Sequence, residues 1–293
     1  MRTSTRKLTN AATSAAIEAT NSMATEPIAP SRPVSHDARM SDSTFKDHFS
    51  RQAEQYSRYR PGYPPELVAY VASLAPGRRL AVDCATGNGQ AAVALAAHFE
   101  RVLAVDGSAA QLAQALPHPK VRYERAMAEA LPVGDAEVDL VAVAQAVHWF
   151  DFDRFHAECR RVLVPGGVVA AWTYTVFRAG AAIDEVVDRF YHDTIGPYWP
   201  PEREFVQQGY RTLPFPWEEV APPRFTLETQ WTLAQAIGYF ASWSSVQKYR
   251  EHHPGEDPLP ALERTLATVW PADSTVRLNW PLFLRVGRHR PHL

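Results

Sequence analysis

The sequence predicts an α/β protein built on a mostly parallel sheet, and three observations lead to that fold class. Apolar runs of strand length alternate with helical segments between about residues 66 and 172. The run Leu80-Ala-Val-Asp-Cys84 then turns through Gly87 and Gly89 into the start of an Ala-rich helix, and the next apolar run ends in Asp106. Strands that alternate with helices imply parallel pairing through right-handed crossovers.

The segment from Leu80 to Leu95 predicts a strand, a tight loop and a helix start, and with them a ligand site. Glycines permit backbone conformations that a Cβ disfavours, and they let the main chain approach a ligand closely. The helix start adds N–H groups without partners inside the helix. Gly87, Gly89 and Ala92 also match the G-x-G-x-x-G/A pattern of dinucleotide-binding folds, so the loop alone leaves two classes of cofactor open.

Asp106 narrows the choice of ligand. It ends the second strand about twenty residues after the glycines, where a carboxylate can accept hydrogen bonds from ribose hydroxyls. We therefore expect a ligand that contains an adenosine-like ribose. The alternative interpretation of Asp106 is a residue that caps the helix beginning near Ser108.

The remaining pattern places the other elements. Strands are expected at 102–106, 120–126, 138–145 and 168–172, with helices at 66–74 and 152–163. Further along, strands are expected at 224–231 and 276–286, with helices at 233–251 and 259–270. Ligands of such sheets bind at the carboxyl ends of the strands. The residues at these ends are Asp83, Asp106, Ala128, Glu129 and Gln145.

Together these motifs resemble the class I S-adenosylmethionine-dependent methyltransferases over roughly residues 45–172. The segments that carry the resemblance are the loop with Asp83, Gly87 and Gly89, then Asp106, 126–132, 139–150 and 160–167. Within that family the chain looks most like methyltransferase type 11 proteins and the small-molecule group that includes trans-aconitate methyltransferases. The subgroup resemblance rests on Tyr59-Arg60-Pro61, on Gln145-Ala-Val-His148-Trp149 and on 238–249.

The resemblance implies a Rossmann-like sheet of seven strands in the order 3-2-1-4-5-7-6, with an antiparallel last strand and helices on both faces. It also implies S-adenosyl-L-methionine as cofactor. The residues expected to bind it are Asp83, Ala85, Gly87, Gly89, Asp106, Ala128, Glu129 and Gln145, with Tyr56 and Arg60 from an N-terminal lid as candidates to meet its carboxylate. The alternative for that N-terminal segment is a helix packed on the sheet. Ala85 stands where the family usually has glycine, and we expect binding to survive the added methyl group.

The expected function is methyl transfer to an oxygen or nitrogen of a small molecule, with a carboxylic acid or a natural-product intermediate as candidate acceptors. An ionised carboxylate needs no general base, whereas a phenol, alcohol or ammonium must lose a proton. His148 is the candidate base, because imidazole titrates near neutral pH, and Asp151 is the second candidate. The alternative for His148 is a structural residue packed beside Trp149.

The chain is expected to divide into a disordered tail at 1–40 and a methyltransferase domain at 41–293. A transit peptide and a start-site artefact remain alternatives for the tail. Within the domain, nine aromatic residues between Phe177 and Trp217 predict a cap inserted at about 177–222, whose aromatic walls suit a planar acceptor. Arg178, Arg203 and Arg211 lie in the same segment and could pair with an anionic substrate.

Composition excludes several classes of protein. The net charge of −2 argues against a nucleic-acid-binding protein, and two cysteines without ligand spacing argue against a metal site or a disulfide framework. No apolar run is long enough to span a membrane, so we expect a cytoplasmic protein. The oligomeric state stays open. The alternatives to a methyltransferase are a nicotinamide-dependent oxidoreductase and a non-catalytic protein that retains the cofactor fold.

Overall fold

A computed structural model describes residues 62–290 of the chain. They lie within the second of the two compact units of the chain, Phe45–Leu293. The predicted tail at 1–40 and the two predicted lid residues, Tyr56 and Arg60, lie outside the described residues.

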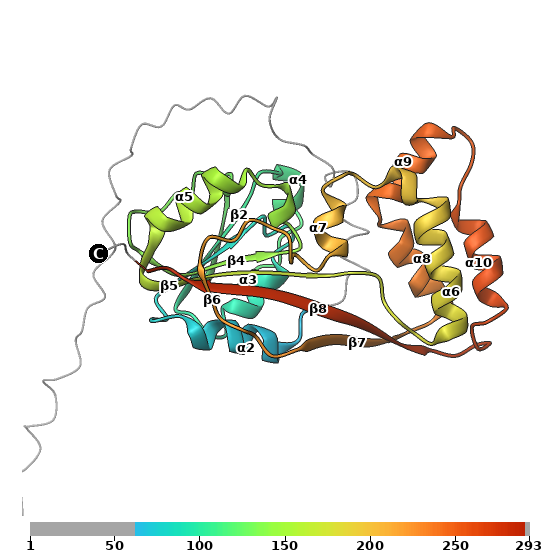
Figure 1. Ribbon diagram of the computed structural model, residues 1–293, viewed down its shortest axis with the longest axis horizontal. Helices are drawn as coiled ribbons and strands as arrows, with labels where there is room; N and C mark the ends of the chain where they lie inside the picture. Colours follow the sequence, from blue (N-terminus) through green and yellow to red (C-terminus); the bar gives the residue numbers. More distant parts are fainter. Residues whose placement is uncertain (1–61, 291–293) are drawn as a thin grey trace, which may run out of the picture. The chain divides into compact units, whose positions relative to one another are not determined.

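The first half of the described chain alternates strands and helices, as predicted (Figure 1). Its strands are β1 (Leu80–Cys84), β2 (Arg101–Asp106), β3 (Val121–Arg125), β4 (Val138–Ala144) and β5 (Leu163–Tyr174). Its helices are α2 (Pro65–Leu74), α3 (Gln90–Leu95), α4 (Ala109–Leu112), the 3-10 turn η2 (Val147–Trp149) and α5 (Phe152–Val162). The five strands pair in parallel in the order β3-β2-β1-β4-β5, which confirms the predicted α/β fold class.

The last strand, β8 (Val276–Arg288), lies antiparallel beside β5, as the family resemblance implied. Its other edge carries two short strands in succession, β6 (Glu218–Glu219) and β7 (Phe225–Trp231). Pro222 and Pro223 separate the two strands, and because proline has no N–H to donate, the ladder is interrupted there. The described sheet therefore has eight strands where seven were expected.

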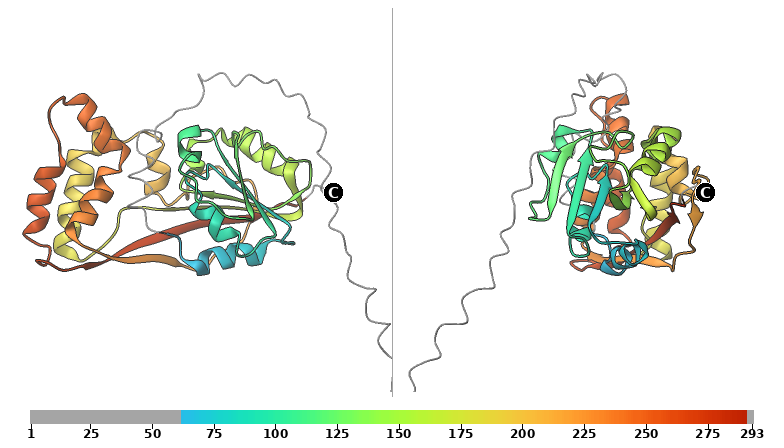
Figure 2. Two further views of the ribbon diagram at one scale, coloured as in Figure 1. Left: turned by 180° about the vertical axis from the view of Figure 1, so that it is seen from behind. Right: turned by 90° about the vertical axis from the view of Figure 1, so that its left-hand side faces the viewer.

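Helices cover both faces of the sheet (Figure 2). Alternate residues of the buried strands point to opposite faces. Ala81 and Ala142 pack in one apolar cluster with residues of α2 and α3, whereas Val82 and Val143 pack in a second cluster with α5. The carboxyl ends of the parallel strands stay uncovered by this arrangement, because the helices lie along the faces.

A group of helices stands beyond those carboxyl ends (Figure 1). It consists of α6 (Ala181–Arg189), the π-helical turn η3 (Phe190–Thr194), the 3-10 turn η4 (Gly196–Tyr198), α8 (Leu233–Ala241), α9 (Ser244–His252) and α10 (Leu259–Ala267). β8 reaches this group because it runs past the end of β5: Leu282 pairs with Tyr174, while β8 begins six residues earlier, at Val276. We call these helices the end helices.

The structure of the end helices and of the segment 177–222 differs from the prediction at two points. The single helix expected at 233–251 is two helices, α8 and α9, separated by Ser242 and the buried Trp243. The segment predicted as a cap at about 177–222 supplies residues to two places. Its first part joins the end helices, whereas α7 (Arg203–Gln207) and the residues after it, including Tyr210, pack in the apolar cluster on the α5 face.

Candidate active site

The loop after β1 holds three left-handed residues in five positions. Ala85 has φ +52°, Gly87 has φ +58° and Gly89 has φ +88°. Glycine adopts this conformation without steric cost. For Ala85 the left-handed region costs roughly 1–2 kcal/mol, so the alanine noted in the sequence is a site of backbone strain.

The two glycines of the loop are needed for different reasons. A Cβ at Gly89 would lie 2.1 Å from the Tyr123 hydroxyl oxygen, so Gly89 allows β3 to pack against the start of α3. A Cβ at Gly87 would meet only the Gln111 Oε1 atom, at 3.7 Å, so here the missing side chain leaves space beside the loop. The open space of the loop is therefore at Gly87 and not at Gly89.

Asp106 fixes this loop from the end of β2. Its Oδ2 accepts a hydrogen bond from the backbone N–H of Gly87 at 2.9 Å, and its Oδ1 accepts one from the N–H of Ser108 at 2.8 Å. Ser108 in turn caps α4 by accepting a hydrogen bond from the N–H of Gln111 at 3.3 Å. The carboxylate predicted to bind ribose therefore also organises the loop that faces it.

Asp83 is a buried acid beside the same loop. Its Oδ2 accepts a hydrogen bond from Thr86 Oγ1 at 2.6 Å, while its Oδ1 is buried without a hydrogen-bond partner. Burial raises the pKa of Asp83 from 3.8 to about 7, against the opposing effects of hydrogen bonding from Thr86 and from the backbone of Ala92, and the negative charge of Asp106 raises it further. An acceptor of this kind, on the strand that leads into the glycine loop, suits a ligand with donor groups such as an ammonium or ribose hydroxyls.

The loop after β3 is tied to the start of α5. Ala128 is buried, and Glu129 Oε1 accepts a hydrogen bond from the backbone N–H of Asp151 at 3.0 Å. Asp151 caps α5 by accepting a hydrogen bond from the N–H of Arg154 at 3.1 Å. The structure thus places Asp151, the second candidate base, at a helix start outside the pocket lining described below.

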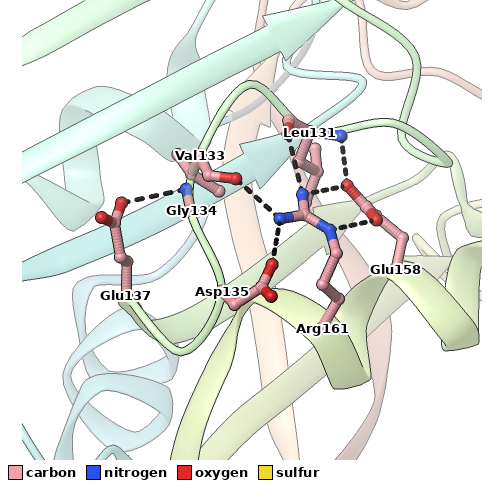
Figure 3. Close-up of polar contacts among 7 residues, drawn as sticks. All are labelled: Leu131, Val133, Gly134, Asp135, Glu137, Glu158 and Arg161. Atoms are coloured by element: carbon pink, nitrogen blue, oxygen red, sulfur yellow. Dashed lines mark hydrogen bonds and ion pairs between the residues drawn. The ribbon is translucent and has the colours of Figure 1, made fainter. Parts of the chain in front are cut away.

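Arg161 of α5 fastens the continuation of that loop (Figure 3). Its guanidinium donates to the carbonyl oxygens of Leu131 and Val133 at 3.1 and 2.9 Å, and it forms ion pairs with Glu158 and Asp135 at 2.7 and 2.8 Å. Glu158 also accepts a hydrogen bond from the N–H of Leu131 at 2.6 Å. The expected cofactor loop is therefore held by one arginine that the sequence analysis placed in a motif without assigning it a role.

A pocket opens at the carboxyl ends of β4 and β5. From this side it is lined by Gln145, His148, Trp149 and Tyr174. From α7, α8, α9 and their connections it is lined by Trp199, Pro200, Arg203, Tyr239, Trp243 and Ser244. Because β4 is hydrogen-bonded to β1, with Val143 opposite Cys84, this pocket adjoins the end of the strand that leads into the glycine loop. We call it the aromatic pocket.

Gln145 enters the aromatic pocket in a strained conformation, with φ +62°. Its Oε1 accepts a hydrogen bond from Thr173 Oγ1 at 2.8 Å, which fixes the amide, and its Nε2 is buried without a partner. Non-glycine residues persist in this backbone region where the surroundings enforce it, often at binding sites.

His148 lines the aromatic pocket as a neutral ring. It is 6% exposed, and its Nδ1 lies 2.9 Å from the Tyr210 hydroxyl. Burial lowers the pKa of His148 from 6.5 to about 3; the charge of Arg203 lowers it further, and that of Glu202 opposes the shift. This corrects the expectation, taken from the ordinary imidazole pKa, that His148 titrates near neutral pH.

Several residues in or beside the aromatic pocket were not predicted from the sequence. Tyr210, the partner of His148, lies 62 positions away in the chain, and no local pattern connects them. Tyr239 and Trp243 fell inside a segment assigned to one continuous helix. Their aromatic density was the available signal, but only the turn between α8 and α9 brings Trp243 to the pocket.

The described residues also bear on the predictions about membrane-spanning helices, metal-binding clusters and cysteines. In residues 62–290, no helix is both long and apolar enough to cross a membrane, and no group of three or more His, Cys, Asp or Glu side chains is placed to hold a metal ion. Cys84 and Cys159 are buried thiols, and burial raises the pKa of both well above the ordinary value.

Comparison with known proteins identifies relatives of the chain. Residues 82–171 match the family described as methyltransferase domain. A protein of Dictyostelium discoideum named as a methyltransferase is 30% identical over 252 residues, covering 83% of this chain and 95% of that protein. A solved structure from Anaeromyxobacter dehalogenans, titled as a type II methyltransferase, is 46% identical with a TM-score of 0.75 and covers 80% of this chain and 100% of that one.

A third relative is the Saccharomyces cerevisiae protein CRG1, named as an S-adenosylmethionine-dependent methyltransferase. It is 30% identical over 132 residues, which cover 42% of this chain and 45% of that protein. The names of these three proteins specify no methyl acceptor, and the trans-aconitate subgroup stays a prediction.

Proposed function

Because the chain belongs to the class I S-adenosylmethionine-dependent methyltransferase family, we propose that it moves a methyl group to an oxygen or nitrogen of a small molecule in the aromatic pocket. The observation that supports this most is the adjacency of two features. The strained glycine loop follows β1, and the aromatic pocket begins where the neighbouring strand β4 ends. Ligands of open α/β sheets bind at such strand ends.

The residues that would hold the cofactor come from four strand ends. The backbone from Ala85 to Gly89 would lie against it, with Asp83 and Asp106 offering acceptors for its ammonium and ribose hydroxyls. Ala128 and Glu129 would border the adenine, and Gln145 would flank the transferring end. Tyr56 and Arg60 remain the candidates for its carboxylate. When bound, S-adenosylmethionine supplies an electrophilic sulfonium methyl group, which a lone pair of the acceptor attacks as the carbon–sulfur bond breaks.

For such a reaction the protein contributes mainly orientation and exclusion of water. The aromatic walls contributed by Trp149, Trp199 and Trp243 suit both tasks. His148 is held by Tyr210 and stays neutral, so it can orient an acceptor but is a weak general base. An acceptor that is already ionised at neutral pH, such as a carboxylic acid, needs no base and fits this pocket best.

The two alternatives gain nothing from these findings. A nicotinamide-dependent oxidoreductase is permitted by the glycine loop alone, whereas the relatives with names are methyltransferases. A non-catalytic protein was suggested by Ala85, and the structure shows that this alanine keeps the left-handed conformation of a glycine.

Calorimetric titration with S-adenosylhomocysteine, run beside NADH and NADP⁺, tests the cofactor assignment. Micromolar binding of S-adenosylhomocysteine alone is expected. Transfer from S-adenosylmethionine carrying a labelled methyl group is then measured against carboxylates, phenols and amines. Binding of a nicotinamide nucleotide, or of none of the three ligands, would contradict the proposal.

A further inference from the structure

The aromatic pocket contains hydrogen-bond donors for which residues 62–290 provide no acceptor. Gln145 Nε2 and Trp199 Nε1 are buried and have no hydrogen-bond partner in this part of the chain, and both side chains line the pocket. A buried donor without an acceptor is unfavourable, and buried polar groups in folded proteins are nearly always hydrogen-bonded, so each such donor calls for a partner. Two of them in one pocket indicate a ligand rich in acceptor atoms.

Arg203 places a positive charge in the same pocket. Its guanidinium carbon lies 4.4 Å from the centre of the Trp199 ring, and its Nε donates to the Tyr191 hydroxyl at 3.0 Å. These contacts position the side chain, and the hydrogen bond to Tyr191 uses Nε and not the terminal nitrogens. Among the described residues no carboxylate forms an ion pair with Arg203, and the described lining of the pocket contains no Asp or Glu.

The other arginines of the segment are placed differently. Arg178 forms an ion pair with Asp188 at 2.7 Å, and Arg211 is exposed with its Nε donating to the Gln208 carbonyl oxygen at 3.0 Å. Of the three arginines that the sequence offered for an anionic substrate, only Arg203 lines the aromatic pocket. An ammonium acceptor would meet the charge of Arg203 in the pocket lining, whereas Glu202, the acid whose charge acts on His148, is not part of that lining. The aromatic walls alone would suit an ammonium group.

We propose that the methyl acceptor carries a carboxylate, and that Arg203 binds this carboxylate in the aromatic pocket beside the Trp199 N–H. The body of the acceptor is planar or apolar, because Trp149, Trp243 and Tyr239 form the remaining walls. A planar guanidinium held over an aromatic ring presents paired N–H groups that match the two oxygens of a carboxylate. The inference rests on the proposed function, since it names the substrate class of that site.

The test is a set of calorimetric titrations on the full chain with S-adenosylhomocysteine present. The probes are benzoate, cinnamate and 3-phenylpropionate, each compared with its neutral amide, and phenethylamine as the cationic probe. We expect at least one carboxylate to bind tenfold or more tightly than its amide. Arg203→Gln is expected to weaken that carboxylate by about 10- to 100-fold and to leave the amide unchanged.

Two further variants separate recognition from folding. Trp199→Phe keeps an aromatic ring beneath Arg203 and removes the indole N–H together with the five-membered ring, so a loss of several-fold is expected for the carboxylate. Arg211→Gln removes an exposed arginine of the same segment and is expected to change nothing. The affinity of every variant for S-adenosylhomocysteine should match that of the wild type, which shows that the fold and the cofactor site are intact.

The outcomes distinguish this inference from the proposed function. If S-adenosylhomocysteine does not bind the wild type, the proposed methyltransferase function is contradicted, and the carboxylate assignment, which rests on it, is contradicted with it. If it binds but no carboxylate exceeds its amide, or phenethylamine binds more tightly than the carboxylates, the carboxylate assignment is wrong. If the wild type and Arg203→Gln bind the carboxylate with equal affinity, Arg203 does not bind the carboxylate.

Discussion

Asp106 and Gly87 are joined by a hydrogen bond of 2.9 Å from the glycine N–H to the carboxylate Oδ2. Through this bond the acidic end of β2 fixes the loop that follows β1. The two motifs that first indicated a ribose-containing ligand are therefore one structural unit. A change at Asp106 removes both the group proposed to bind ribose and the group that holds the loop.

Asp106→Ala is predicted to weaken binding of S-adenosylhomocysteine by about 10- to 150-fold, the equivalent of the 1.5–3 kcal/mol of hydrogen bonds to a charged group. Calorimetric titration measures the change. Ser108→Ala is the control, because it removes the cap of α4 and keeps the carboxylate. An affinity of Asp106→Ala within twofold of the wild type would show that the carboxylate does not contact the ligand.

Ala85→Gly is predicted to stabilise the protein by about 1 kcal/mol, since glycine relieves the left-handed strain at φ +52°. Urea denaturation followed by circular dichroism gives the free energy of unfolding. Ala94→Gly, within α3, is the matched control and should destabilise by about 0.5–1 kcal/mol. If both substitutions destabilise, Ala85 carries no strain.

The lowered pKa of His148 predicts that the free energy of unfolding falls as the pH is lowered. Its pKa is about 3 in the folded protein and 6.5 as the ordinary value, so between these pH values the unfolded chain binds a proton that the folded protein does not. The free energy of unfolding should fall by about 1.4 kcal/mol per pH unit from this group as the pH drops below 6.5. His148→Gln should remove that slope, and His192→Gln, at an exposed histidine, serves as the control. Equal slopes in His148→Gln and the wild type would contradict the prediction.

The raised pKa of Asp83 predicts the opposite dependence of the free energy of unfolding on pH. Its pKa of about 7 lies above the ordinary 3.8, so the folded protein binds a proton between these values that the unfolded chain releases. The resulting stability is present at acid pH and is lost as the pH rises through about 7. Asp83→Asn should therefore lose stability more steeply than the wild type between pH 6.5 and 4.5. A shallower acid loss in this variant would show that Asp83 is ionised when buried.

Arg161→Met is predicted to destabilise the protein by about 1–3 kcal/mol, discounted for the partial exposure of its ion pairs, and to weaken binding of S-adenosylhomocysteine. The reason is that the carbonyls of Leu131 and Val133 lose the group that holds their loop. Arg160→Met is the matched control: its guanidinium lies over the Trp217 ring at 5.2 Å and is not bonded to that loop. Unchanged affinity in Arg161→Met would mean that the loop does not border the ligand.

Much of the parallel sheet followed from local pattern. The strand ending in Asp83, the glycine turn and the strand ending in Asp106 lie where periodicity placed them, because each is a short apolar run closed by a polar residue. The predicted helix at 152–163 is α5, with Asp151 as its cap. The strand expected at 224–231 is β7, whereas the two-residue strand β6, which precedes Pro222 and Pro223, was not expected.

The contacts that form the aromatic pocket could not be predicted from local sequence pattern. His148 and Tyr210 meet only because α7 packs on the face of the sheet that α5 covers, and Arg203 reaches the pocket from that same helix. The pKa of His148 is set by burial, which depends on residues from several elements. Separation along the chain carries no information about such contacts.

The sequence by itself determined the alternation of strands and helices and the position of the glycine loop, because these depend on periodicity and on spacing within short segments. The family and the sheet order followed from the resemblance that these motifs carry. Only the tertiary structure decided that Ala85 and Gln145 are strained, that His148 is neutral and that Arg203 is the arginine that lines the pocket. The physical reason is that strain, desolvation and charge pairing arise from neighbours in space, and folding brings those neighbours from distant parts of the chain.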